Sequence, residues 1–294
     1  MTVIASIGPN LPQDLLIATG SYSGTLPFNP DQACPRAGKW LESKFAPWAL
    51  PVLEAWADGG YNAFDSVVFS RADDTSHRLY YYVCELQRRE LIGGPEAIVF
   101  DVAKLDRRSS IERTTDQVRR LSAKLGLTPG QLEAGIVETN QKRGEMKVEP
   151  GPRPCLLAGT PPPDRRLHEA IAKAGFSPVG ETITEYWSRL GTPVAEGSGD
   201  PVAALARQIH AEPIGPRCLA DPAKRLAEQI SSTGAQAVVL WRIEEDEAEA
   251  WHLPAQRDAL DASGISYLVM TRRDWRAADG AAAEIGAFLE GVSS

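Results

Sequence analysis

Short runs of consecutive apolar residues alternate along the chain with longer stretches in which apolar residues recur every three or four positions. The short runs predict buried strands, and the longer stretches predict amphipathic helices. Strands that alternate with helices of about 10–15 residues are typical of parallel βαβ units, so the pattern predicts an α/β fold. The predicted strands cover residues 15–19, 65–70, 96–102, 155–160, 176–181, 237–243 and 265–270.

A proline-rich stretch divides this pattern in two. Residues 148–155, with the sequence VEPGPRPC, contain three prolines, and the alternation of strands and helices restarts after them. Prolines at this density are typical of a boundary between folded segments. We therefore expect two doubly wound parallel-sheet domains, residues 1–150 with a helical segment and residues 151–294, with a helical bridge near residues 108–147.

Composition and charge exclude several classes of partner. The chain has 294 residues and a net charge of −8, with a pI of about 5.2. An acidic chain gives no electrostatic reason to expect nucleic acid or an anionic membrane. No apolar run approaches the roughly 20 residues of a membrane helix, and the first 16 residues lack the basic and apolar regions of a secretory signal. The sequence predicts a cytoplasmic protein.

Two polar loops follow predicted strands, at the end where parallel α/β sheets bind ligands. No glycine-rich dinucleotide loop, Walker loop or GxSxG elbow accompanies them, so the sequence gives no indication of a dinucleotide, a nucleoside triphosphate or serine hydrolysis. The loop after residues 65–70 contains Arg71, Asp73, Asp74 and His77, and the loop after residues 237–243 contains Glu244, Glu245, Asp246, Glu247, Glu249 and His252.

The four cysteines are Cys34, Cys84, Cys155 and Cys218, and no two of them form a CxxC pair. This spacing argues against a structural zinc site and against a disulfide scaffold. Cysteines far apart in sequence can still converge on an iron–sulfur cluster. The simpler alternative is that they are buried thiols, because an unmodified cysteine packs like a small apolar residue.

The ordered set of segments resembles the cluster-carrying subunits of the 2-hydroxyacyl-CoA dehydratase and benzoyl-CoA reductase family. Each piece is short, but together they extend over nearly the whole chain. The matching pieces are QDLLIATG at 13–20, the Cys34-Pro35 stretch, and residues 64–86, 98–126, 127–143, 153–175, 237–270 and 281–290.

This resemblance implies a subunit of two α/β domains that holds a [4Fe-4S] cluster with three cysteines. Subunits of this kind pair with a paralogue, and a separate ATP-hydrolysing activator delivers one electron. The implied chemistry is ketyl-radical dehydration, or ring reduction, of a CoA thioester.

The sequence departs from the family at the cluster ligands. Cys34 fills the first cysteine position, but the second aligns with Ala72-Asp73 or Asp73-Asp74, and the third with Asp246-Glu247. Alanine offers no donor atom, and an aspartate oxygen is a hard ligand that replaces a thiolate poorly on a soft cluster.

Three hypotheses for the site follow. In the first, the chain is a cluster-free subunit, in a homo- or hetero-oligomer, that supports a catalytic paralogue acting on an acyl-CoA. In the second, it still holds a [4Fe-4S] cluster through Cys34 and Cys218, or with Cys84 or an aspartate as an unusual ligand, and catalyses the dehydration or reduction itself.

In the third hypothesis, the acidic loops form an oxygen-rich site for a divalent metal or for acid–base catalysis on a small organic acid or thioester. Asp73, Asp74 and His77 are then the catalytic candidates, Asp73 and Asp246 the metal ligands, and Glu245 and His252 their neighbours. The simpler alternatives are that the second loop is a solvated acidic turn and that Asp73 or Asp74 only caps the following helix.

Overall fold

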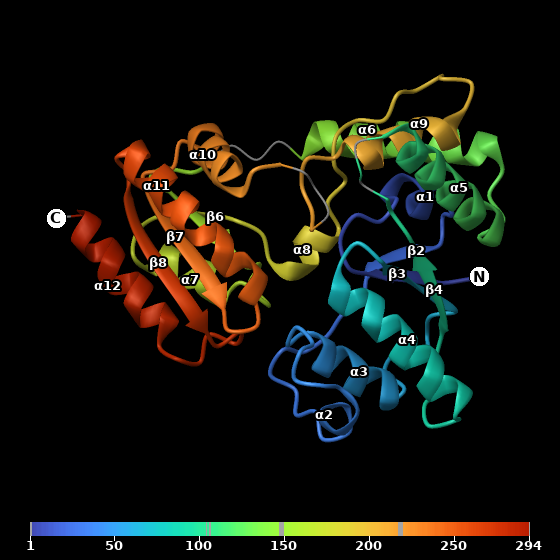
Figure 1. The fold of residues 1–294 in the computed structure, drawn as a ribbon, viewed down its shortest axis with the longest axis horizontal. Coiled ribbons are helices and arrows are strands. Elements are labelled where there is room, and N and C mark those ends of the chain that lie inside the picture. Colours follow the sequence, from blue (N-terminus) through green and yellow to red (C-terminus); the bar gives the residue numbers. More distant parts are fainter. Residues whose placement is uncertain (1, 104, 106, 147–149, 217–219, 294) are drawn as a thin grey trace. The chain divides into compact units, whose positions relative to one another are not determined.

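The structure is a computed structural model that describes residues 2–103, 105, 107–146, 150–216 and 220–293. The chain folds into two units (Figure 1). The first unit comprises the described residues of Met1–Glu42, Ala49–Lys147 and Trp187–Leu219, and the second those of Ser43–Trp48, Val148–Tyr186 and Ala220–Ser294. Each unit contains one four-stranded, all-parallel sheet flanked by helices, so the predicted pair of doubly wound α/β domains is confirmed.

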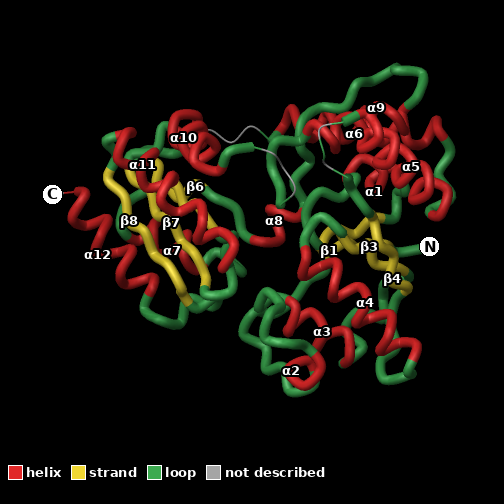
Figure 2. The backbone as a smooth tube through the Cα atoms, viewed as in Figure 1, coloured by secondary structure: helices red, strands yellow, loops and turns green. Residues whose placement is uncertain are grey.

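The first sheet has the strand order β2-β1-β3-β4. Helices α3 and α4 lie on one of its faces, and α1 and α5 lie on the other (Figures 1 and 2). Its strands are β1 (Ile4–Ile7), β2 (Tyr22–Thr25), β3 (Ser66–Ser70) and β4 (Glu96–Phe100). The helices of this unit are α1 (Gln13–Ala18), α2 (Ala37–Trp40), α3 (Ala49–Ala57), α4 (Asp74–Arg88), α5 (Arg108–Lys124), α6 (Pro129–Glu145) and α9 (Pro201–Ala211).

The strand predicted at residues 15–19 is wrong, because this segment belongs to helix α1. A central parallel strand is covered on both faces. Leu15 and Leu16 are fully buried, but Ile17 and Ala18 remain partly exposed, which is the one-sided burial of a surface helix. The true first strand, β1, is only four residues long, and a run that short is easily missed.

The two helices expected as a bridge, α5 and α6, both belong to the first unit. Helix α6 packs against α1, and α5 packs against α9. Thr128 forms a reciprocal capping box with Gln131 at the start of α6, as the Thr-Pro sequence predicts. A shared apolar core lies between these helices and the sheet, with Leu15, Val68, Phe100, Val118, Leu132, Ile136 and Leu205 among its buried members.

Nothing in the sequence pattern indicates that the chain returns to the first unit after residue 186. Arg143 on α6 holds the returning segment by donating to the backbone oxygen of Leu190 at 2.6 Å. The same guanidinium donates to the Asp14 carboxylate on α1 at 2.8 and 2.7 Å. Asn140 on α6 donates to the Val194 oxygen and accepts from the Val194 amide. Helix α9 then completes the core.

The second sheet repeats the same topology, with the order β6-β5-β7-β8. Helices α10 and α11 cover one face, over a core that contains Leu156, Val238, Leu240 and Leu260. On the other face α12 packs against α7 (Figure 1). The strands are β5 (Pro154–Gly159), β6 (Ser177–Val179), β7 (Ala237–Ile243) and β8 (Ser266–Arg273), and the helices are α7 (Arg166–Lys173), α8 (Ile183–Trp187), α10 (Pro222–Thr233), η1 (Glu247–His252), α11 (Leu253–Ser263) and α12 (Ala281–Ser293).

Among the described helices, none combines the length and the apolar composition that crossing a membrane requires.

Candidate functional site

Both loops singled out by the sequence lie at the point where the strand order of a sheet reverses. In the first unit the chain goes from β1 outward to β2 and then returns to β3 on the other side of β1. In the second unit it goes from β5 to β6 and returns to β7 in the same way. Doubly wound sheets bind their ligands at this switch point, outside the carboxyl ends of the strands. The turn after β3 and the loop after β7 are therefore the candidate sites.

The turn after β3 is tightly packed against the end of β1. The buried Ser70 hydroxyl donates to the Pro9 oxygen and accepts from the Ala72 amide at 3.0 Å. Gly8 has a φ of +90°, and a Cβ atom on it would lie 2.8 Å from both Ser70 Cβ and Ser76 Oγ. Only glycine tolerates this backbone and this approach without strain, so the turn is fixed in place by its neighbour.

Asp73 is the N-cap of helix α4. Its carboxylate accepts from the Ser76 amide at 2.6 Å, and the Ser76 hydroxyl donates to the Ile7 oxygen at 3.3 Å. Asp74 lies in the first turn of α4 with its side chain 83% exposed and its nearest carboxylate oxygen 3.9 Å from the Arg78 guanidinium. The predicted capping role of Asp73 is therefore confirmed. A further chemical role for Asp73 or Asp74 stays a prediction.

His77 lies one turn into α4, in a row of aromatic side chains. Its ring meets Tyr81 edge-on with 5.1 Å between centroids, and Tyr81 meets Tyr80 at the same separation. Tyr80 in turn packs against Phe69 of β3, and burial raises its pKa to about 12. The aromatic row thus runs from the sheet to the exposed Tyr81, and His77, which packs against Tyr81, is half-buried.

A cationic cluster lies at the same edge, and the sequence analysis named its Arg71 but not its partners Asp101 and Arg113. Arg71 follows β3 directly, and its Nη1 donates to Asp101 Oδ2 at 2.8 Å. Asp101 follows β4 directly and is buried. Arg113 on α5 donates to the same oxygen through Nη2 at 2.6 Å and Nε at 3.3 Å. The parallel pairing of Ser70 with Phe100 brings Arg71 and Asp101 side by side, which the sequence alone does not reveal.

In the second unit, Asp246 lies in the loop after β7, at the switch point, and its side chain is half-buried. The Thr160 hydroxyl, at the end of β5, donates to it. Burial raises the Asp246 pKa, and the hydrogen bond from Thr160 and the charge of Arg242 only partly oppose this shift. Arg242 forms an ion pair with Glu249 at 3.1 Å. Thr160 and Arg242 are site residues that the sequence analysis missed.

The other residues of the acidic loop differ in their surroundings. Burial raises the pKa of Glu245, whereas a hydrogen bond from Arg272 lowers the pKa of the exposed Glu244. His252 is the last residue of η1 and is exposed. By exposure, Glu244, Glu245 and Glu247 are solvated, as in an ordinary acidic turn, whereas Asp246 and Glu249 are half-buried.

The cysteines of the described residues lie in separate surroundings. Cys34 donates to the Gln32 oxygen at 3.2 Å in the loop before α2. Cys84 lies within α4 beside Tyr80, and burial raises its pKa. Cys155 is fully buried in β5, and burial raises its pKa to about 12. Cys218 lies outside the described residues.

These donors do not fit a [4Fe-4S] cluster of the kind the resemblance implies. Cluster ligation needs thiolates. At the two positions where the resemblance places the second and third thiolates, the chain instead has the Asp73 carboxylate, which caps α4, and the Asp246 carboxylate, which accepts from Thr160. Within the described ranges, no group of three or more His, Cys, Asp or Glu side chains has an arrangement that could hold a metal ion. The assignment of Asp73 and Asp246 as metal ligands stays a prediction.

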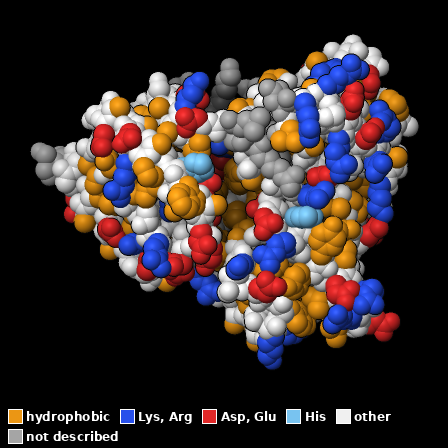
Figure 3. Space-filling view, viewed as in Figure 1, with side chains coloured by type: hydrophobic (Ala, Val, Ile, Leu, Met, Phe, Trp, Pro, Cys, Tyr) orange, Lys and Arg blue, Asp and Glu red, His pale blue; other side chains and the backbone are white. Residues whose placement is uncertain are grey.

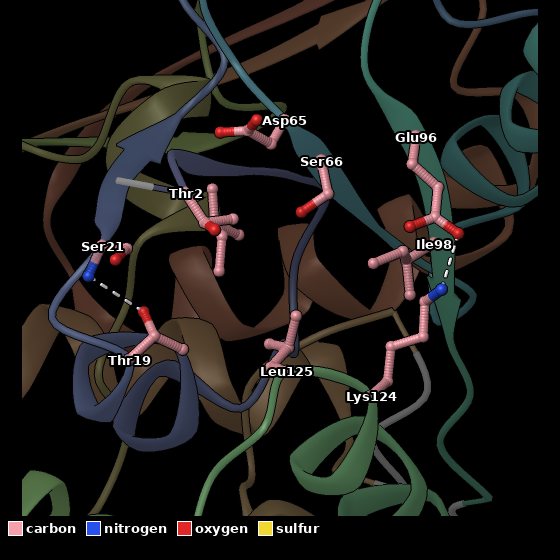
Figure 4. A pocket seen from close by; sticks show the side chains of 10 residues that line it. Thr2, Thr19, Ser21, Asp65, Ser66, Glu96, Ile98, Lys124 and Leu125 are labelled. Carbon is pink, nitrogen blue, oxygen red and sulfur yellow. Dashed lines mark hydrogen bonds and ion pairs between the residues drawn. The ribbon is translucent and has the colours of Figure 1, made fainter.

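A shallow hollow lies at the opposite, amino-terminal edge of the first sheet (Figure 4). Its volume is about 310 Å³. Lys124 reaches from α5 to Glu96 on β4, and their ion pair of 2.6 Å closes one side. Asp65 is already engaged by the Val3 amide at 2.6 Å. Because its charged groups are paired with the protein itself, this hollow is a weaker candidate than the carboxyl edge. The remaining lining residues are Thr2, Ile4, Thr19, Ser21, Ser66, Ile98 and Leu125.

Comparison with known proteins adds no relative to this picture: no protein-family model matches the sequence, and no curated protein matches it.

Proposed function

We propose that the protein is a subunit of the 2-hydroxyacyl-CoA dehydratase and benzoyl-CoA reductase type that supports a cluster-carrying paralogue without holding a [4Fe-4S] cluster itself. The observation that carries the proposal is which residues form the turn between β3 and α4 and what their side chains bind. Where the resemblance places a thiolate ligand, Ala72 offers no donor atom and the Asp73 carboxylate caps α4. The turn keeps its position at the switch point, but its side chains are used for structure.

The architecture of both units supports the same proposal. The family pairs two doubly wound domains in each subunit, and the chain contains two four-stranded parallel sheets of identical order. In this role the protein associates with a cysteine-complete paralogue that acts on an acyl-CoA, and the ATP-dependent activator serves that paralogue. The function of this chain is then to complete the oligomer.

Anaerobic purification followed by iron, sulfide and EPR analysis tests the cluster-free assignment. We expect far less than one iron per chain and no EPR signal after reduction. About four irons per chain, with a cluster signal, would contradict the proposal.

Co-expression with a cysteine-complete paralogue tests the supporting role: we expect a stable complex whose dehydratase or reductase activity needs both chains. Activity of this chain alone would contradict that role.

One observation favours a second candidate, an enzyme that acts on a small organic acid or thioester without a cluster. Asp246 lies at the second switch point with a raised pKa, as a carboxyl group suited to proton transfer would. If a divalent metal assists it, Mn²⁺, Zn²⁺ or Mg²⁺ should bind tightly, and binding should be lost in Asp246→Ala or Asp73→Ala. Unchanged metal binding in both variants would exclude these ligands.

A further inference from the structure

The cluster of Arg71, Asp101 and Arg113 lies where three elements of the first unit meet. Arg71 and Asp101 are the first residues after the neighbouring strands β3 and β4, and Arg113 lies in the second turn of α5. The Arg71 amide also donates to the Phe100 oxygen at 2.9 Å, which fixes the backbone of Arg71 to the end of β4. Three rigid elements therefore hold the cluster at the carboxyl edge of the sheet.

The two guanidinium groups share one carboxylate oxygen. Asp101 Oδ2 lies 2.8 Å from Arg71 Nη1 and 2.6 Å from Arg113 Nη2. The Asp101 side chain is only 10% exposed, whereas those of Arg71 and Arg113 are 39% and 53% exposed. One buried negative charge thus orients two positive charges that both remain accessible to solvent.

The arginines retain donors that Asp101 does not use. A guanidinium group has five N–H donors in a planar fork, and Arg71 directs only Nη1 to Asp101. Arg71 Nε is shielded from solvent, and no hydrogen-bond acceptor for it lies among the residues that the structure describes. Because solvent does not reach Nε, the donors open to a ligand are on the exposed parts of the Arg71 and Arg113 side chains.

The acidic residues of the adjacent turn have other partners. The Asp73 carboxylate accepts from the Ser76 amide, and the exposed Asp74 carboxylate lies near Arg78. The Arg71–Asp101–Arg113 cluster therefore has an excess of one positive charge at the edge of the sheet where ligands of this fold bind. A guanidinium fork matches the geometry of carboxylate and phosphate oxygens.

We propose that Arg71 and Arg113, positioned by Asp101, bind an oxyanion, the phosphate or carboxylate group of a small molecule, at the carboxyl edge of the first sheet. The proposal goes beyond a supporting role, because it gives this chain a ligand of its own. It is also independent of the iron content, so either proposal can fail while the other stands.

Isothermal titration calorimetry on the full chain at low ionic strength tests the site. Inorganic phosphate, pyrophosphate and succinate are the probes, and they distinguish a phosphate from a carboxylate ligand. The variants are Arg113→Gln, which removes one fork, and Arg71→Lys and Arg113→Lys, which keep the charge but lose the fork. Arg108→Gln is the matched control, because Arg108 lies on the same helix, is exposed and pairs with Glu112 at 2.9 Å.

We expect at least one probe to bind the wild type, and its affinity to fall about 10- to 100-fold in Arg113→Gln, as the loss of a charge-assisted hydrogen bond predicts. The affinities of the two lysine variants should lie between those of the wild type and Arg113→Gln. The affinity of Arg108→Gln should match that of the wild type within about twofold. Thermal melts check that each variant is folded. If Arg113→Gln does not fold, the two lysine variants still test the site. The proposal is overturned if the wild type binds none of the probes at about 10 mM, or if all folded variants bind as the wild type does.

Discussion

At the scale of single residues, the first switch point depends on the absence of a side chain. Gly8 allows the end of β1 to approach Ser70 and Ser76 closely, and this approach lets the Ser70 hydroxyl reach Pro9. A residue without a side chain thus determines where the β3–α4 turn lies. Sequence reasoning selected the polar residues of the turn but not the glycine that positions them.

Replacement of Gly8 by alanine should destabilise the protein by about 3 kcal/mol, because the added methyl group meets two side chains and the positive φ disfavours any L residue. Gly20→Ala is the control. Gly20 also has a positive φ, but no atom lies within 4 Å of a Cβ placed on it, so its cost should be about 1 kcal/mol. Urea denaturation measures both values, and equal costs would show that the close approach does not matter.

Asp246 shows how burial alters a carboxyl group at the other switch point. Because burial raises its pKa above the ordinary value of 3.8, the folded state binds the proton more tightly than the unfolded chain does. The contribution of Asp246 to stability is therefore largest at low pH and is lost as the pH rises through the raised pKa.

Asp246→Asn does not titrate and can still accept the Thr160 hydrogen bond, so we expect it to gain stability relative to the wild type as the pH rises from about 3.8 to 7. Urea denaturation at several pH values measures this difference. Glu244→Gln should follow the opposite trend, weakly, because a hydrogen bond from Arg272 lowers the pKa of the exposed Glu244. A loss of relative stability by Asp246→Asn over this range would contradict the raised pKa.

At the scale of elements, the ends of the helices were more predictable than the first strand. Asp200 and Asp221 each cap a helix with proline at its first position, as their Asp-Pro sequences indicate. Capping depends on neighbours in sequence, so it can be read locally. Whether residues 15–19 form a strand or a helix depends on which of their side chains other elements cover. The contact of Arg71 with Asp101 depends on the pairing of β3 with β4. Both are properties of the folded chain.

The cap of α4 allows the role of Asp73 to be tested directly. Asp73→Ala should cost about 1 kcal/mol, because the Ser76 amide loses its acceptor, whereas Asp73→Asn should retain most of the stability. Asp74→Ala, at an exposed position, should change the unfolding free energy by less than about 0.5 kcal/mol. Thermal and urea denaturation provide the comparison. If Asp73→Ala and Asp74→Ala lower the unfolding free energy by the same small amount, the hydrogen bond from the Ser76 amide to Asp73 does not stabilise the protein.

At the scale of the whole molecule, Figure 3 shows how charged side chains are distributed over one face. On the face drawn in Figure 3, acidic and basic side chains are interspersed over both units. The net charge of −8 therefore does not form a single patch on that face. This face therefore presents local groups of charges to a ligand and no single extended charged field.

The division of the chain into units leads to a prediction for fragments. A fragment of residues 1–150 contains the first sheet but lacks α9, which supplies Ala204, Leu205 and Ile209 to its core. We expect this fragment to keep helical circular dichroism, to bind a hydrophobic dye and to melt without a sharp transition. Addition of a peptide of residues 187–219 should sharpen the transition. A cooperative melt of the fragment alone would show that α9 is dispensable.

The return of residues 187–216 to the first unit, held by Arg143 and Asn140, has a consequence for the gene. No single cut in the coding sequence separates the two units, because the codons of the first unit flank codons of the second. Recombination at one crossover point would transfer a unit without part of its core. A sequence that acquired a new second unit would have to replace separate stretches of codons, on both sides of those for residues 187–219.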